Sequence, residues 1–214
     1  MKVAINILSA EKIYAPKKIE ELDEKRIVPK MMLRRRLTRN AKIMLYLADK
    51  CGFDGTKVVY ASAFGELQAT VGITDAINNA SAISPTLFQN SVYNSAPSYF
   101  SLLNEDKDEI LTLSNGDKSS LDAIKTAALQ SLISGEKVFC VVSECLDIER
   151  IDELNSCIKY LESGAGVVLE IAQDEKGAID LEKNCEEGLP NSTKELVSLV
   201  NMCQRKKTKI YIEL

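Results

Sequence analysis

Residues 110–142 read ILTLSNGDKSSLDAIKTAALQSLISGEKVFCVV, and this stretch decides the fold class. It predicts a strand, a sharp turn, a helix and a second strand, because an apolar run, a polar turn, a helically spaced segment and another apolar run follow one another. Gly116 permits a tight backbone in the turn, and Gly135 ends the helix. The helical spacing is carried by Leu121, Ile124, Ala128 and Leu132.

The turn within this stretch is the first candidate site. Open α/β sheets place their chemistry where a strand ends at its carboxyl side and a helix opens. Asp117 occupies the position where a Cys or Ser nucleophile would act. Two interpretations remain open and are compatible. Asp117 is either an N-cap that accepts amide hydrogens at the positive end of the helix, or a residue that has replaced a nucleophile.

The rest of the chain alternates between strand and helix patterns. Strands are expected at residues 3–7, 57–63, 164–172 and 208–214, and residues 10–30 are expected to form a long surface loop. Apolar residues on one face predict a helix ending at Gly52, and Ser192-x-x-Glu195 predicts a capping box that opens a last helix. We therefore expect one α/β domain over residues 1–214, with a sheet covered on both faces.

Composition narrows the classes of function. The chain is 45% hydrophobic and 27% charged with a net charge of −4, which indicates a globular protein and does not favour nucleic-acid binding. No apolar run approaches a membrane span and the start lacks a signal-peptide pattern, so we expect a cytoplasmic protein. Six cysteines without a CxxC pair, in a chain without histidine, argue against a zinc site. We expect no metal and no cofactor.

Other glycine and cysteine patterns carry no specific chemistry. Gly164-Ala165-Gly166 lacks the third glycine and the helix of a dinucleotide fingerprint, and is typical of a bend or close packing at the start of a strand. Cys140 lies in an apolar strand and should be buried and inert. Cys145 follows that strand and could be exposed, but the sequence offers it no activating partner.

Two further segments suggest binding surfaces. Residues 84–103 mix small residues with aromatic ones, a composition that allows close backbone approach and large contact area, although Pro97 must start a helix or kink one. Residues 30–39 hold the one basic cluster. Such a run is typical of a solvated surface or, alternatively, of a docking patch for an acidic partner, here formed by Arg34, Arg35, Arg36 and Arg39.

Three motifs together resemble a known family. They are SAFGELQAT (62–70), SPTLFQNSVYNSAP (84–97) and LTLSNGDKSSLDAI (111–124). In order and spacing they are similar to the amino-terminal half of β-ketoacyl synthases, and especially to the ketosynthase-like chain length factors, over roughly residues 34–172. The resemblance implies a thiolase-like half: a mixed five-stranded sheet sandwiched between helices, here followed by a C-terminal helix and strand.

The resemblance also bears on activity. True ketosynthases carry a cysteine in a turn that reads like A-C-S-T-S-L, and Asp117 stands in its place in GDKSSL (116–121). The family's two histidines lie in the carboxyl-terminal half, and this chain contains no histidine. Both features argue against condensation activity, because a carboxylate cannot hold an acyl group as a thioester.

Chain length factors pair with an active ketosynthase, and the acyl channel runs along their interface. The resemblance therefore implies that residues 87–103 and 110–117 face a partner, although the same residues could simply pack the core. The expected interface and channel residues are Phe88, Asn90, Tyr93, Asn94, Tyr99, Phe100, Thr112 and Ser114.

Three hypotheses about function follow. The first is a non-catalytic partner of a β-ketoacyl synthase in fatty-acid-like or polyketide-like synthesis, including that of aryl polyenes. The second is a stand-alone homodimer that binds an acyl group or an acyl carrier protein, with the basic cluster docking the carrier. The third is a residual decarboxylase or hydrolase that uses Asp117 or Cys145.

Overall fold

The computed structural model describes residues 1–214 except 56, 106–107, 150, 152–156, 183 and 204–207. Its centre is a seven-stranded mixed sheet in the order β3-β2-β4-β5-β1-β7-β6. β2 lies parallel to β3 and β4, whereas β5 and β1 run antiparallel to their neighbours. The strands are β1 (Lys2–Ala15), β2 (Lys57–Ala61), β3 (Ile110–Leu113), β4 (Val138–Cys145), β5 (Glu162–Ile171), β6 (Ile179–Asp180) and β7 (Lys209–Glu213).

The expected mixed sheet and its C-terminal strand are confirmed, but the sheet is wider than five strands. The five strands from β3 to β1 are extended by β7, which the sequence predicts, and by β6, which it does not. β6 has only two residues, and both are exposed. A strand this short leaves no alternating pattern to read in the sequence.

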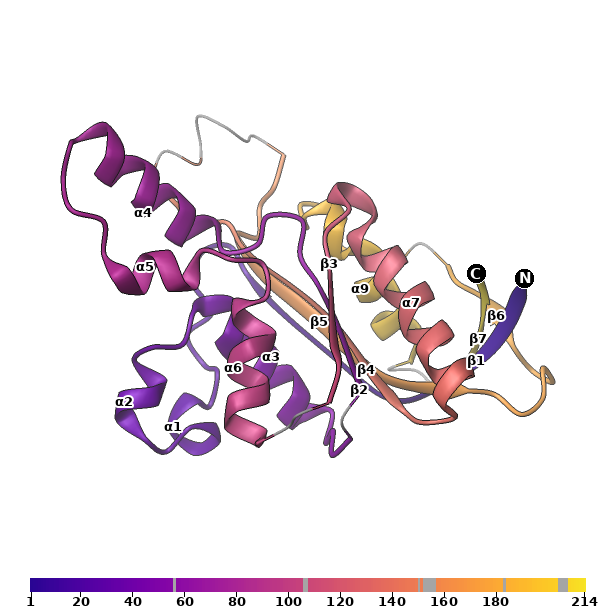
Figure 1. The fold of residues 1–214 in the computed structure, drawn as a ribbon. Helices are drawn as coiled ribbons and strands as arrows, with labels where there is room; N and C mark the ends of the chain where they lie inside the picture. The colour runs from indigo at the N-terminus through magenta and orange to yellow at the C-terminus, as the bar shows by residue number, and fades with distance from the viewer. Residues whose placement is uncertain (56, 106–107, 150, 152–156, 183, 204–207) are drawn as a thin grey trace.

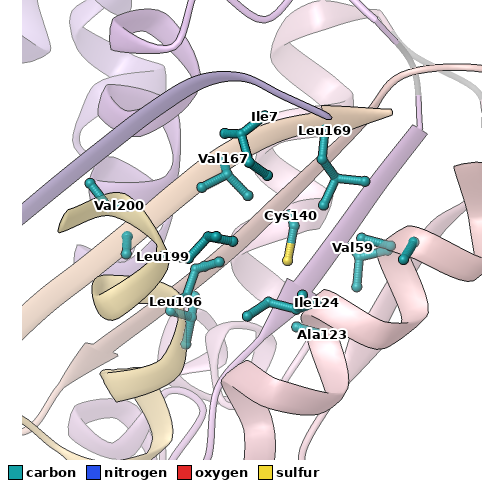
Figure 2. Close-up of a cluster of buried hydrophobic side chains, with 14 of the residues drawn as sticks. Ile7, Val59, Ala123, Ile124, Cys140, Val167, Leu169, Leu196, Leu199 and Val200 are labelled. Atoms are coloured by element: carbon teal, nitrogen blue, oxygen red, sulfur yellow. The ribbon is translucent and has the colours of Figure 1, made fainter. Parts of the chain in front are cut away.

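Helices cover both faces of this sheet, as expected (Figure 1). α3 and α6 pack on one face, and α7 and α9 pack on the other. Figure 2 shows Ile124 of α7 and Leu196 of α9 meeting Cys140 of β4 in the second of these layers. The helices are α1 (Glu24–Ile27), α2 (Met31–Arg34), α3 (Arg39–Lys50), α4 (Leu67–Asn78), α5 (Pro85–Asn90), α6 (Ser95–Asn104), α7 (Ser119–Ser134) and α9 (Lys194–Cys203), with 3₁₀ turns η1 (Gly116–Lys118) and η2 (Asn191–Thr193).

The predicted strand, turn, helix and strand of residues 110–142 are β3, η1, α7 and β4. Gly116 adopts φ +53° in the turn and Gly135 adopts φ +72° directly after α7, so both glycines supply the left-handed backbone expected of them. Pro97 lies in the first turn of α6, where a proline is tolerated because its missing amide has no helical acceptor.

The prediction of a surface loop over residues 10–30 is wrong, because its first part is strand, α1 lies within it, and Ile19, Leu22 and Val28 are buried in the core. β1 continues to Ala15 and pairs with β5 from Ile5 to Ala15, with an irregularity between Ile7 and Ser9. The sequence misled because Glu11 and Lys12 interrupt the apolar pattern. Lys12 Nζ donates to Glu186 Oε1 at 2.8 Å, so its charge is compensated by a residue far along the chain.

Gly164 and Gly166 serve close packing, as one of the sequence interpretations holds. A Cβ atom at Gly164 would lie 2.6 Å from Ile43 Cγ2, and one at Gly166 would lie 2.8 Å from Phe139 Cε2. Two residues apart on β5, both face the side of the sheet that α3 covers. The pair therefore lets α3 approach the sheet closely.

The capping box predicted at residues 192–195 does not form. Ser192 Oγ donates to Glu144 Oε1 at 2.7 Å, and Glu195 Oε2 accepts a hydrogen bond from Ser120 Oγ at 2.7 Å. Both side chains are taken by tertiary partners, and the 3₁₀ turn η2 leads into α9 instead. Among the described residues, no helix has the length and apolarity that crossing a membrane requires.

Candidate functional site

The turn at Asp117 is exposed, and its carboxylate interacts with another loop. Asp117 Oδ2 accepts a hydrogen bond from Asn191 Nδ2 at 3.0 Å. The prediction that Asp117 caps α7 is wrong, because the 3₁₀ turn η1 precedes the helix and Lys118 occupies the N-cap position without a side-chain cap. Ser119 Oγ closes the turn instead by accepting from Asn115 N and donating to Gly116 O.

A cavity of about 300 Å³ lies beside this turn. Two lysines, three carboxylates and a thiol line it, so its charges are mixed. In a chain without histidine, a catalytic base for a nucleophile here would have to be a carboxylate or a lysine. The cavity is lined by Asp117, Lys118, Glu182, Cys185, Asn191, Lys194, Glu195 and Ser198.

The possibility that Cys145 is exposed is contradicted. Cys145 is the last residue of β4 and is buried, and burial raises the pKa of its thiol well above the usual value. Glu162, Glu66 and Glu144 act in the same direction, and Arg39 opposes them. Cys140 is buried as predicted, and burial likewise raises the pKa of its thiol. Neither thiol is poised to act as a thiolate nucleophile.

A buried carboxylate at the carboxyl end of β4 was not singled out by the sequence. Glu144 accepts hydrogen bonds from Ser62 Oγ at 2.8 Å, Ala63 N at 2.6 Å and Phe64 N at 3.3 Å, besides the one from Ser192. Burial raises the pKa of Glu144, and these hydrogen bonds oppose the rise. Glu144 thereby joins the end of β2, the start of the segment that leads to α4, and η2.

Two more glutamates are buried on the α3 side of the sheet. Glu162 binds Arg39 through two hydrogen bonds, from Nε at 2.7 Å and from Nη2 at 2.5 Å. Glu66 accepts a hydrogen bond from Thr38 Oγ1 at 2.7 Å. A sequence signal exists only for Glu144 and Glu162, which adjoin apolar strand runs. The neighbouring sequence does not indicate which residues compensate the charges of these two glutamates.

The basic cluster divides into engaged and exposed residues. Arg39 is the partner of Glu162 and also donates to Ile19 O, so its guanidinium is not available for docking a carrier protein. Arg34 Nη1 donates to Val28 O at 2.7 Å. Arg35 and Arg36 are exposed. The docking hypothesis is therefore reduced to Arg35 and Arg36.

A groove of about 280 Å³ separates α6 from the edge strand β3. Two predicted channel residues, Asn94 and Thr112, line it. Five of its seven residues are polar, so its floor offers hydrogen bonds more than apolar contact. The lining residues are Asn94, Pro97, Ser98, Ser101, Asp108, Ile110 and Thr112.

The other predicted interface residues do not line this groove. Phe88 on α5 is 69% exposed, and Ser114 lies exposed after β3. Tyr99 OH donates to Asn90 Oδ1 at 2.9 Å, which ties α6 to α5. Phe100 differs, because it is buried in the core against Phe53, with ring centroids 6.5 Å apart.

Tyr93 lies on the surface close to the segment that follows β2. Its hydroxyl donates to Ala63 O at 3.2 Å, and its ring lies against Gly65, where a Cβ atom would approach within 3.0 Å. Gly65 adopts φ +57°, so the tight turn before α4 and the contact with Tyr93 both require glycine.

β3 forms one edge of the sheet. Within the described part of the chain, β3 pairs with β2 alone. Leu113 O accepts from Ser62 N, and main-chain groups alternate in direction along a parallel strand. The N–H and C=O of Thr112 therefore face away from the sheet, toward the groove side of the molecule.

Comparison with solved structures identifies proteins of the same fold. One is a ketosynthase (ApeO) in complex with its chain length factor (ApeC) from Xenorhabdus doucetiae, with TM-score 0.62, 20% identity, and 79% of this chain and 80% of that chain covered. Another is AntDE:AntF, a type II PKS acyl-carrier protein in complex with its ketosynthase bound to the hexaketide, with TM-score 0.63, 14% identity, and 97% and 84% covered. A third is the ishigamide ketosynthase/chain length factor, with TM-score 0.57, 15% identity, and 82% and 63% covered.

At these identities the likeness shows the shared thiolase-like fold. Comparison with curated protein sequences gives no match. Family assignment comes from the sequence itself, because residues 10–211 match the family described as "Beta-ketoacyl synthase, N-terminal domain". With nearly its whole length matched, the chain belongs to the family of β-ketoacyl synthase N-terminal domains.

Proposed function

We propose that the chain is a non-catalytic ketosynthase-like subunit of the chain length factor type. It pairs with an active β-ketoacyl synthase in the synthesis of fatty-acid-like or polyketide-like chains, among which aryl polyenes are one class. The observation that carries the proposal is the edge of β3, which within the described part of the chain pairs with β2 alone and lies beside a groove. We further propose that residues 1–214 act as one domain, supported by a single sheet that draws strands from both ends of the chain.

The edge strand supports pairing with another chain. An uncovered edge presents unpaired N–H and C=O groups, which native proteins normally shield or use for association. α4 and α5 lie together at one end of the molecule (Figure 1), and apolar side chains on these helices and on the loops that follow them are exposed, which is typical of an interaction surface. They are Ile77, Ile83, Phe88, Val92 and Tyr93.

Three features support the absence of catalysis. Asp117 stands at the turn where a ketosynthase carries its cysteine, and it is held by Asn191. The chain contains no histidine. Cys145 is buried, with a raised thiol pKa, and therefore cannot replace the missing nucleophile. For the hypothesis of a residual enzyme, Cys145 is therefore excluded as the reactive residue, and Asp117 is the remaining candidate.

A second candidate function is a homodimer that binds an acyl carrier protein without chemistry. One observation favours it: Arg35 and Arg36 are exposed next to Met31 and Met32, which are also exposed. These four residues form a local surface that is both basic and apolar, which suits the binding of an acidic carrier protein. Either function is proposed for the cytoplasm, where thiols stay reduced, because none of the six cysteines forms a disulfide bond.

Thr112→Pro tests the proposed function directly. Proline removes an outward-facing donor while leaving the β2 pairing intact, since edge strands tolerate proline where the N–H faces outward. Thr112→Val is the matched control, because it keeps the donor and the side-chain shape. A candidate β-ketoacyl synthase partner is co-expressed with each variant, and the complexes are purified and their dissociation constants compared.

Loss of one backbone hydrogen bond predicts a complex roughly tenfold weaker for the proline variant and nearly unchanged for the valine variant. Product length should also change when this chain is left out. The proposal fails if wild-type chain forms no stable complex with the ketosynthase and product length is unaffected. A stable homodimer in light scattering, together with salt-sensitive carrier binding lost in Arg35→Ala, would favour the second candidate.

A further inference from the structure

One buried carboxylate holds the segment between β2 and α4. Glu144, near the end of β4, is fully buried, and each of its two oxygens accepts one backbone N–H and one serine hydroxyl. Oε1 accepts from Ala63 N at 2.6 Å and from Ser192 Oγ at 2.7 Å. Oε2 accepts from Ser62 Oγ at 2.8 Å and from Phe64 N at 3.3 Å. Glu144 therefore binds the N–H groups of two successive residues after β2.

Both oxygens of this carboxyl group must accept hydrogen bonds. We call residues 62–65 the β2–α4 turn. A carboxylate has two acceptor oxygens, whereas the amide of glutamine has one oxygen and an NH2 group that only donates. A serine hydroxyl can reverse its direction, but a backbone N–H cannot. Glutamine at position 144 would therefore oppose an N–H of the β2–α4 turn with another donor, whichever way its amide is turned.

Two exposed aromatic side chains lie at the β2–α4 turn. Phe64 is 43% exposed, and Tyr93, which follows α5, is 44% exposed. Tyr93 OH donates to Ala63 O at 3.2 Å, and its ring lies against Gly65. Ala63 is thus bound on both sides, by Glu144 at its N–H and by Tyr93 at its carbonyl group. The placement of both aromatic residues depends on the main chain that Glu144 holds.

The β2–α4 turn begins beside the edge strand of the sheet. Ser62 N donates to Leu113 O, at the end of β3, at 3.1 Å. The other end of the turn is fixed by Asn40 Nδ2, which donates to Gly65 O at 2.8 Å. Aromatic residues are enriched in protein–protein interfaces. The aromatic pair therefore extends the surface that the edge of β3 offers to a partner.

We propose that Glu144 is a positioning residue for binding of the ketosynthase partner: its carboxylate fixes the β2–α4 turn, which presents Phe64 and Tyr93 to that partner. This inference rests on the proposed function and adds Phe64 to the surface assigned there. Glu144 is buried, so its effect on binding passes through the main chain of the turn. Ser192 of η2 orients the carboxylate through its hydrogen bond to Oε1.

Glu144→Gln in the full chain tests the hold on the turn. Ala63 or Phe64 should lose its acceptor, and hydrogen exchange at that amide should become roughly tenfold faster. The ring resonances of Tyr93 should shift in NMR spectra of the same variant. The complex with a candidate β-ketoacyl synthase should become roughly tenfold weaker.

Glu162→Gln is the matched control. Glu162 is 1% exposed and lies on the neighbouring strand β5, but it binds Arg39 and Ile19 N instead of the β2–α4 turn. Its substitution should destabilise the chain without moving the Ala63 amide or weakening the complex of the folded chain. Equal losses of affinity in both variants would reduce Glu144 to general stability, and unchanged exchange within the turn of Glu144→Gln would remove its hold there. Either result overturns the proposal.

Phe64→Ala shows whether Glu144 acts through the presented side chain. Phe64 is exposed, so the variant should fold and should bind the ketosynthase about tenfold more weakly. Glu144→Gln added to Phe64→Ala should then weaken the complex less than it does in the wild-type chain, because both changes act through one contact. Fully additive losses, or a Phe64→Ala complex as tight as wild type, would overturn the proposal.

If Glu144→Gln does not fold, Ser192→Ala takes its place. Ser192 Oγ and Ala63 N share the acceptor Oε1, so loss of the hydroxyl should shift the Ala63 amide resonance and weaken the complex roughly threefold. Ser198→Ala is its matched control, because Ser198 is also buried and binds Asn184 N instead of Glu144. An Ala63 resonance that moves equally in both variants, or in neither, overturns the proposal.

Failure of the proposed function is separately visible in the wild-type chain. A wild-type chain that binds no ketosynthase overturns the proposed function and the binding role of Glu144 together. A wild-type complex that Glu144→Gln leaves equally tight overturns the positioning role alone.

Discussion

Replacing Arg39 by methionine should strongly destabilise the fold, although Arg39 belongs to a cluster that reads as surface in the sequence. The side chain of Arg39 is 13% exposed and that of Glu162 is 2% exposed. Their two hydrogen bonds are 2.7 and 2.5 Å long, and Arg39 Nη2 also donates to Ile19 O at 2.8 Å. Arg39→Met leaves the Glu162 charge buried without its cation.

Removing one partner of a buried ion pair costs about 3–5 kcal/mol of unfolding free energy. For a chain of this length, that corresponds to a drop in Tm of roughly 6–20 °C. Urea unfolding followed by circular dichroism is the suitable assay, because the chain has no tryptophan to report by fluorescence. Arg35→Met is the matched control, since Arg35 is exposed and its loss should change stability by less than about 0.5 kcal/mol.

The double variant Arg39→Met/Glu162→Leu separates the two parts of this effect. Replacing a buried ion pair by apolar residues of similar volume is often nearly neutral, so the double variant should recover much of the loss. If Arg39→Met costs less than about 1 kcal/mol, as little as Arg35→Met, then the pair does not hold α3 to β5 as argued. In that case Arg39 would return as a candidate for docking a carrier.

Three further predictions concern other parts of the chain. Gly164→Ala should cost about 1–3 kcal/mol in urea unfolding, because its Cβ would lie 2.6 Å from Ile43 Cγ2; an unchanged midpoint would mean that α3 can move away from the sheet. Cys145 should react with a thiol reagent far more slowly than the exposed Cys157 in the native protein, a ratio that peptide mapping reports, and equal rates would contradict its burial. Asp117→Cys should not create condensation activity with acyl and malonyl carriers, since no histidine is present; measurable ketoacyl product would refute the proposed loss of chemistry.

Elements with strong periodicity could be predicted from the sequence. The β3, η1, α7 and β4 unit was predictable because its apolar spacing and its two glycines agree with one another. The second half of β1 was not predictable, because charged residues such as Lys12 stand in a strand and are compensated only by distant partners. The same holds for the failed capping box, whose Ser192 is used by Glu144.

The candidate site shows the same division. Exposed residues of the segment after β2, such as Phe88 and Tyr93, were identified from composition and resemblance. Phe100 has the same composition signal and is buried, because α6 turns that side chain toward the core under α3. Whether such an aromatic residue is exposed or buried depends on which way its side of the helix faces in the folded protein. The local sequence does not specify that direction.

The sequence by itself determined which reactive groups the chain offers: Asp117 stands in the turn, and the chain has no histidine, whatever the fold. The tertiary structure decided which side chains are accessible and which charges are compensated. Asp117 is held by a residue 74 positions away, and Arg39 pairs with one 123 positions away. Burial and ion pairing depend on such long-range neighbours, so residues of one type, such as Arg35 and Arg39, can differ completely in role.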